Sequence, residues 1–231
     1  MERNRKIWMQ ILALTAVLRF FSFDLQTAVL ASAEDIAVEC TEQEEEKPKI
    51  ALTFDDGPDI RHTPALLDGL KERGIKATFF LIGANTEKEG SKEIVKRMYE
   101  EGHLIGNHTY RHVDLSKLNE QESEKEIRMT DEAIRKITGY ETELIRPPFG
   151  AMPEGEEDPD KLYVKWTVDS LDWVTKDAEK IVEKVVADTK EGDIILMHDC
   201  YGESVEAALK IIDRMVEKGY EFVTVEELLM D

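Results

Sequence analysis

The stretch KIALTFDDGP, residues 49–58, decides the fold class of this chain. Its apolar first half is typical of a buried strand, and Gly57-Pro58 ends that strand sharply. Two adjacent carboxylates, Asp55 and Asp56, therefore lie on a turn at the strand's carboxyl end. Such a pair can serve two purposes, with one carboxylate holding a metal ion and the other accepting a proton. A simple Asx turn is the alternative, so the decision depends on the other motifs.

Apolar strands alternate with amphipathic helices along the rest of the chain. We expect strands at 49–54, 77–83, 103–107, 143–146, 162–169, 193–197 and 220–224. We expect helices that begin at Thr63, Ser91, Asn119, Asp177 and Ser204 and stop at or before Gly74, Gly102, Gly139, Gly192 and Gly219, with a last turn capped by Thr224. This alternation predicts parallel strands joined by helical crossovers, and seven strands favour a barrel-like closed sheet.

Residues 1–33 are organised as an export signal. A basic start at residues 3–6 precedes an uncharged, mostly apolar run over 7–18, and Ala31-Ser32-Ala33 fits a signal peptidase site. No run of about 20 apolar residues is available for a membrane-spanning helix. We therefore expect cleavage after Ala33 and a secreted or cell-surface protein, with an uncleaved membrane anchor as the alternative.

The remainder of the chain divides into a linker and one domain. Residues 34–48 are acidic and aperiodic, as in a linker, and residues 49–231 suffice for a domain with a sizeable core. The formal net charge of −20 argues against nucleic acid as a partner. We expect a monomer, and the sequence leaves open whether Cys40 and Cys200 form a disulfide.

Polar residues that could take part in catalysis or metal binding follow the carboxyl ends of five expected strands. They are Asp55-Asp56, His108 with His112, Arg146-Pro147-Pro148-Phe149-Gly150, Asp169-Ser170-Leu171-Asp172-Trp173 and Leu196-Met197-His198-Asp199. On a helical turn, the spacing of His108 and His112 places both imidazoles on one face, ready for one metal ion. Parallel α/β barrels build their active sites at this end. Each piece alone has an ordinary structural explanation, but five pieces together indicate an active site.

These five motifs, in this order, resemble those of the NodB-like polysaccharide deacetylases, the family-4 carbohydrate esterases. The resemblance covers roughly residues 48–228. It implies a distorted (β/α) barrel of about seven parallel strands. It also implies a divalent metal, usually Zn²⁺ with Co²⁺, Ni²⁺ or Mn²⁺ as alternatives, and removal of acetyl groups from polysaccharides. The acidic loop 151–161 is shorter than the family's, which leaves the shape of the substrate groove open.

The resemblance implies that Asp56, His108 and His112 bind the metal. Three protein ligands leave one coordination position open for water, as a catalytic zinc requires. By the same resemblance, Asp55 is the catalytic base that takes a proton from water, and Arg146 is its orienting partner.

The remaining motifs imply a general acid and a binding pocket. His198 resembles the acid that protonates the departing amine, held in the correct tautomer by Asp169. The backbone N–H of Phe149, together with the metal, would bind the developing oxyanion. Trp173 and Leu196 resemble the apolar walls around the acetyl methyl group.

An exported enzyme of this kind most resembles the bacterial enzymes that deacetylate N-acetylglucosamine in peptidoglycan. Chitin oligosaccharides and acetylated xylan are the alternative substrates. A non-catalytic, metal-stabilised glycan-binding protein is the alternative class. Asp55 and His198 argue against that class, because binding alone needs neither a base nor an acid.

Protein secreted by the native host should begin at Glu34, because the small residues at positions 31 and 33 place the cleavage site after Ala33. N-terminal sequencing of protein from the culture medium checks this expectation. An intact Met1 would contradict cleavage and would support an anchor.

Overall fold

The computed structural model describes residues 46–153 and 160–230. The expected export signal and all but the end of the expected linker lie outside these residues, as does the centre of the acidic loop 151–161. Within the described part, no helix has the length and hydropathy that crossing a membrane requires.

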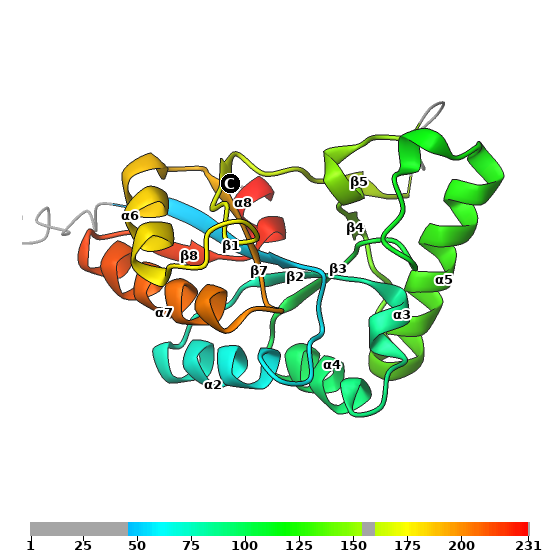
Figure 1. Cartoon of the computed structure of the whole chain (residues 1–231), viewed down its shortest axis with the longest axis horizontal. Coiled ribbons are helices and arrows are strands. Elements are labelled where there is room, and N and C mark those ends of the chain that lie inside the picture. Colours follow the sequence, from blue (N-terminus) through cyan, green and yellow to red (C-terminus); the bar gives the residue numbers. More distant parts are fainter. Residues whose placement is uncertain (1–45, 154–159, 231) are drawn as a thin grey trace, which may run out of the picture. The chain divides into compact units, whose positions relative to one another are not determined.

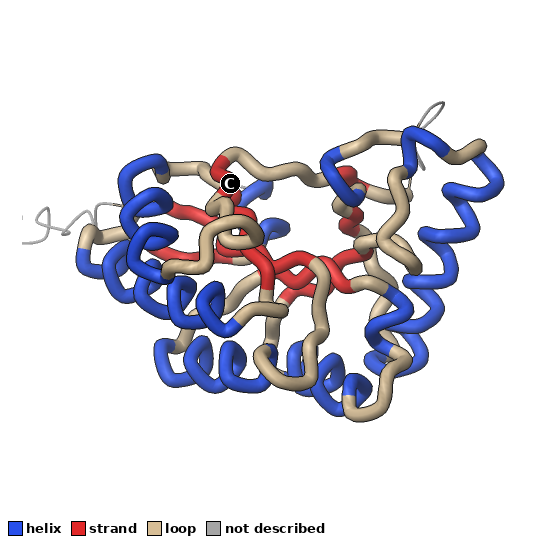
Figure 2. The backbone as a smooth tube through the Cα atoms, in the orientation of Figure 1, coloured by secondary structure: helices blue, strands red, loops and turns tan. Residues whose placement is uncertain are grey.

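In the described part of the chain, eight strands form one parallel sheet that curls around the centre of the domain (Figure 1, Figure 2). Their order is β5-β4-β3-β2-β1-β7-β6, and β8 pairs with the first half of β1. The strands are β1 (Lys49–Asp55), β2 (Thr78–Leu81), β3 (Leu104–Asn107), β4 (Leu144–Ile145), β5 (Leu162–Tyr163), β6 (Val168–Asp169), β7 (Ile194–His198) and β8 (Glu221–Val223). The prediction of a distorted (β/α) barrel with parallel strands is confirmed.

The expected strand 162–169 is two strands, which raises the number from seven to eight. Its first part, β5, pairs with β4, whereas its second part, β6, pairs with β7. Because β5 and β6 end the strand order on opposite sides, residues 164–167 cross from one edge of the curled sheet to the other. A hydrophobic pattern reports burial but not a change of pairing partner, so the sequence shows one strand here.

Helices cover the outside of the sheet, and neighbouring helices contact one another in the order α6, α7, α2, α4 and α5 (Figure 1). The helices are α2 (Thr63–Arg73), α3 (Gly83–Thr86), α4 (Ser91–Glu100), α5 (Glu120–Thr138), α6 (Ala178–Asp188), α7 (Gly202–Glu217) and α8 (Val225–Met230), with 3₁₀ turns at Leu115–Lys117 and Pro148–Gly150. All the expected helices are present, and the short α3 is an addition. Helix α6 ends earlier than expected, at Asp188, and the segment before Gly192 leads into β7.

Strand β1 is buried and separates two apolar layers. Ile50, Leu52 and Phe54 pack into the larger cluster, together with side chains of α2, α6 and α7. Ala51 packs into the smaller cluster on the opposite face. Because side chains alternate along a strand, Asp55 shares the face of Ala51 and enters the interior of the curled sheet.

Candidate metal and catalytic site

Asp55 and Asp56 lie at the end of β1 and on the turn after it, as the sequence predicts. Asp56 has a left-handed backbone (φ 73°), and the Gly57-Pro58 peptide bond is cis. A Cβ atom at position 57 would lie 2.6 Å from Oδ2 of Asp199, so the turn requires glycine there. The turn leaves the two carboxylates in different surroundings, because Asp55 is buried and Asp56 is partly exposed.

The two histidines lie on a loop, and the prediction of a helical turn was wrong. Residues 108–112 follow β3 without helical structure, and Thr109 (φ 61°) and His112 (φ 54°) have left-handed backbones. The N–H group of Gly83, in α3, donates to the carbonyl of Thr109 over 3.0 Å and holds the loop from one side. The tight loop thus brings His108 and His112 together, and the centroids of their rings lie 5.0 Å apart.

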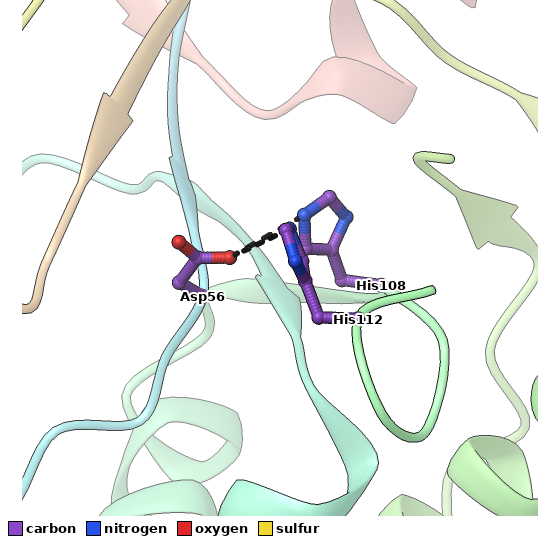
Figure 3. A group of neighbouring side chains, drawn as sticks. All are labelled: Asp56, His108 and His112. Carbon is purple, nitrogen blue, oxygen red and sulfur yellow. Dashed lines mark ion pairs between the residues drawn. The ribbon is translucent and has the colours of Figure 1, made fainter. Parts of the chain in front are cut away.

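Asp56, His108 and His112 converge on one point from the turn after β1 and from the loop after β3 (Figure 3). One potential ligand atom from each residue lies within 4.8 Å of the other two. Nε2 of His112 is 3.3 Å from Oδ1 of Asp56, and Nε2 of His108 is 3.6 Å from the same oxygen. Two imidazole nitrogens and a carboxylate oxygen suit a divalent transition metal.

The hydrogen bonding of His108 and Asp56 fits a metal ion at this point. Nδ1 of His108 lies 2.6 Å from the carbonyl of Arg146, which only accepts, so Nδ1 carries the proton. Burial lowers the pKa of His108 against the pull of nearby carboxylates, so its Nε2 keeps a free lone pair. Oδ1 of Asp56 is buried without a hydrogen-bond partner. A lone pair facing an unpaired anionic oxygen is unfavourable unless a cation lies between them.

Arg146 is fully buried and holds the other carboxylate, Asp55. Nη1 of Arg146 donates to Oδ1 of Asp55 over 2.8 Å and to Oγ1 of Thr53 over 2.6 Å. Burial lowers the pKa of Arg146, and the charge of Asp55 opposes this shift. Oδ2 of Asp55 lies 3.7 Å from Nε2 of His108, so this oxygen borders the candidate metal site.

His198 is held by Asp172, and the prediction that Asp169 does so was wrong. Nδ1 of His198 lies 2.8 Å from Oδ1 of Asp172, and the backbone N–H of His198 donates to Oδ2 over 2.8 Å. Oδ1 of Asp169 instead accepts from the N–H of Leu171 over 2.9 Å, so Asp169 stabilises the loop after β6. The left-handed backbone of Leu171 (φ 57°) turns this loop and brings Asp172 to His198.

The surroundings of His198 favour its protonated form. Burial alone would lower the pKa of His198, but the hydrogen bond and charge of Asp172, with the charges of Asp55 and Asp56, raise it to about 9. A protonated imidazole at neutral pH is what a general acid needs. Nε2 of His198 lies 4.0 Å from Oδ2 of Asp56, so the acidic N–H borders the candidate metal site from the side of β7.

A pocket of about 380 Å³ joins these groups, and every predicted site residue except the buried Arg146 lines it. Leu196 forms a buried wall, whereas Trp173 is 55% exposed. Phe149 is 69% exposed, and its ring meets that of His112 edge-on at 4.8 Å. The lining also includes Trp166 and Tyr201, which the sequence analysis did not single out. The signal in the sequence that could have identified them is that both are aromatic and lie close to the polar motifs at 169–173 and 196–199.

Cys200, next to this pocket, is unsuited to nucleophilic chemistry. Burial raises the pKa of its thiol to about 12, with the charge of Asp199 adding to the shift. Asp199 is itself fully buried, which raises its pKa to about 7, and its Oδ2 accepts from Oγ1 of Thr63 over 2.6 Å. Cys200 is a free cysteine in the described part, and Cys40 lies outside that part.

Comparison with known proteins places this site in a family. The family profile described as "Polysaccharide deacetylase" matches residues 42–159. A peptidoglycan-N-acetylglucosamine deacetylase of Bacillus cereus is 43% identical over 190 residues, which cover 79% of this chain and 68% of the relative. The peptidoglycan-N-acetylmuramic acid deacetylase PdaC of Bacillus subtilis is 39% identical over 180 residues, 78% of this chain. The match spans only 38% of the length of PdaC.

Solved structures agree with the sequence relatives. The structure of B. subtilis PdaC has a TM-score of 0.76 and 37% identity, with 80% of this chain and 91% of that chain covered. A family 4 acetyl xylan esterase from Clostridium thermocellum, in complex with a cobalt ion, has a TM-score of 0.71 and 32% identity, with coverage of 79% and 90%.

Asp172→Asn should lower the rate of deacetylation far more than Asp169→Asn, because an asparagine cannot accept from both the ring and the backbone of His198. General acid catalysis typically contributes about 10²–10⁴-fold, so kcat should fall within this range in Asp172→Asn. Asp169→Asn keeps an oxygen for the N–H of Leu171 and should retain most activity. Steady-state kinetics on both purified variants checks this, and equal losses would contradict the assignment of Asp172.

Proposed function

Because the chain belongs to the polysaccharide deacetylase family, we propose that it is a metal-dependent hydrolase of an extracellular glycan, which removes N-acetyl groups from N-acetylglucosamine in peptidoglycan. The observation that carries this proposal is the buried, unpartnered Oδ1 of Asp56 facing two imidazole nitrogens. The choice of N-acetylglucosamine as the substrate sugar is supported by the name of the B. cereus relative, whereas the name of PdaC specifies N-acetylmuramic acid.

Asp56, His108 and His112 would hold the metal, with the tautomer of His108 fixed by the carbonyl of Arg146. Zn²⁺ suits two nitrogens and a carboxylate, and Co²⁺, Ni²⁺ or Mn²⁺ are the alternatives. When bound, such an ion polarises the acetyl carbonyl and makes water easier to deprotonate.

Asp55 would act as the general base. Its Oδ1 accepts a hydrogen bond from Nη1 of Arg146 over 2.8 Å, which holds the carboxylate in one orientation. Oδ2 borders the metal ligands and is the oxygen that would take a proton from the attacking water. The oxygen of that water then bonds to the acetyl carbon, and the N–H of Phe149 is our candidate for stabilising the negative charge on the carbonyl oxygen.

His198 would complete the reaction as the general acid. The bond between the acetyl carbon and the sugar nitrogen breaks as Nε2 of His198 gives its proton to that nitrogen. Asp172 holds Nδ1, which orients Nε2 toward the pocket and stabilises the charged ring. The products are acetate and a free amine on the sugar, and Leu196 and Trp173 would enclose the departing acetyl methyl group.

The place of action follows from the expected export signal at residues 1–33. A glycan of the cell wall lies outside the membrane, so the substrate and the expected export agree. Cleavage would release the enzyme, and an uncleaved segment would tether it to the membrane. We expect a monomer and no nucleic-acid partner.

Acetate release from peptidoglycan, chitin oligosaccharides and acetylated xylan tests the proposed substrate. N-acetylglucosamine polymers should give a higher kcat/KM than acetylated xylan, and a chelator should abolish turnover until zinc is added back. Mass spectrometry of digested peptidoglycan then shows which sugar lost its acetyl group. A preference for xylan or loss of acetyl from muramic acid would overturn the substrate, and absence of turnover on every substrate would favour a glycan-binding protein.

Asp55→Asn and Asp56→Asn should fail in different ways. Asp55→Asn removes the proton acceptor but none of the ligands, so metal should bind near one equivalent while kcat falls about 10²–10⁴-fold. Asp56→Asn weakens a ligand, so metal content should fall, and excess zinc should restore part of the rate. Metal analysis beside kcat at rising zinc concentration checks both. Equal metal loss in the two variants, or wild-type turnover in Asp55→Asn, would sink the assignment of base and ligand.

A further inference from the structure

The loop that carries His108 and His112 has a backbone that needs external support. Thr109 and His112 both have positive φ angles, 61° and 54°. Left-handed backbone costs free energy in any residue with a Cβ atom, and most in a β-branched residue such as threonine. Such a conformation persists only where surrounding contacts determine it. The contacts of this loop are therefore part of what makes the imidazoles converge.

Glu126, on α5, provides one of these contacts from a buried position. Its side chain is 1% exposed, and its Oε2 accepts from the backbone N–H of Arg111 over 2.9 Å. Its Oε1 accepts from Nε of the same arginine over 2.7 Å and lies 2.6 Å from Nη2. One carboxylate thus holds the backbone and the side chain of the residue directly before His112.

Helix α5 also holds the beginning of this loop. Nδ2 of Asn107 donates to Oδ1 of Asp131 over 2.7 Å and to the carbonyl of Ile127 over 2.8 Å. Oδ1 of Asn107 accepts from the N–H of Thr109 over 2.8 Å, which supports the strained residue directly. The loop is therefore fixed to α5 at both ends, and Glu126 is the anchor on the side of His112.

A simple contribution to stability does not account for the position of Glu126. Burying a carboxylate is costly, and a pair whose arginine is 67% exposed resembles a surface ion pair, which contributes little stability. What the pair achieves is geometric, because three donors of one residue converge on one carboxylate. We infer that Glu126 is a positioning residue that sets the metal affinity of the site by fixing Arg111 and thereby the orientation of His112.

This inference rests on the proposed metal site and is tested on the full chain by metal binding. In Glu126→Gln the amide nitrogen replaces an acceptor and faces a donor of Arg111, so the loop should lose its anchor. The dissociation constant for Zn²⁺, measured by competition with a chromogenic chelator, should rise about 10–100-fold, as is typical for residues that orient metal ligands. Glu124→Gln, an exposed change on the same helix, is the matched control and should bind zinc like the wild type.

The melting temperature of the metal-free protein separates positioning from stability. A purely structural role would lower the melting temperature of Glu126→Gln while its zinc affinity stays equal to that of Glu124→Gln, and this result would overturn the inference. Failure of the wild type to bind zinc would instead overturn the proposed metal site, and the inference with it.

Arg111→Ala decides the matter if Glu126→Gln does not fold, because the arginine side chain is mostly exposed. It removes two donors and leaves the backbone hydrogen bond, so the dissociation constant for Zn²⁺ should rise above that of the wild type and of Glu124→Gln. Where Glu126→Gln does fold, the double variant Glu126→Gln/Arg111→Ala should lose less affinity than the sum of the two single changes, because both residues act through one contact. Wild-type zinc affinity in Arg111→Ala would overturn the proposed role of the Glu126–Arg111 contact. Strictly additive losses of zinc affinity in the double variant would overturn it as well.

Discussion

The guanidinium of Arg146 lies inside the curled sheet, where its donors bind Asp55, Thr53 and the carbonyls of residues 164 and 165. A buried charge is tolerated only when it is paired, and removing one partner typically costs about 3–5 kcal/mol. These bonds tie β1 to the segment that crosses between the edges of the sheet. The carbonyl of Arg146 also fixes the tautomer of His108. One residue therefore holds the candidate base through its side chain and a candidate metal ligand through its backbone.

The sequence predicted the parallel strands, the helix caps at Asn119, Asp177 and Thr224, and the residues that gather at one end of the sheet, because these depend on local pattern. Helix α7 begins at Gly202, two residues before the expected start at Ser204. Where the prediction failed, the cause was tertiary. The spacing of His108 and His112 fits a helix as well as a tight loop, and the positive φ angles of Thr109 and His112 show that the chain forms the loop. Asp169 is the last residue of β6, and Asp172 lies in the loop that follows. The left-handed turn at Leu171, which amino-acid composition does not reveal, decides which of the two carboxylates reaches His198.

Adjacent carboxylates acquire different chemistry here because their surroundings differ. Asp55 faces the buried guanidinium of Arg146, which fixes the orientation of its carboxylate. Oδ1 of Asp56 faces two imidazole nitrogens and no hydrogen-bond donor, so it is suited to a cation. Asp199 is buried behind the same turn, and its raised pKa of about 7 limits the negative charge gathered there. The groups around each carboxylate thus distinguish the candidate ligand, Asp56, from the candidate base, Asp55, whereas the residue type is the same for both.

Three loops of the site, those after β1, β3 and β6, are each held by an element other than the strand that precedes them. The turn after β1 receives a hydrogen bond of 2.7 Å from Nδ2 of Asn85, in α3, to the carbonyl of Asp56. The loop after β6 reaches β7 through Asp172, which binds both the ring and the backbone of His198. The loop after β3 is fixed to α5 through Asn107 and Glu126. Catalytic geometry is therefore built into the packing of the domain, whereas the segment 151–161 contributes none of these bonds through its described residues.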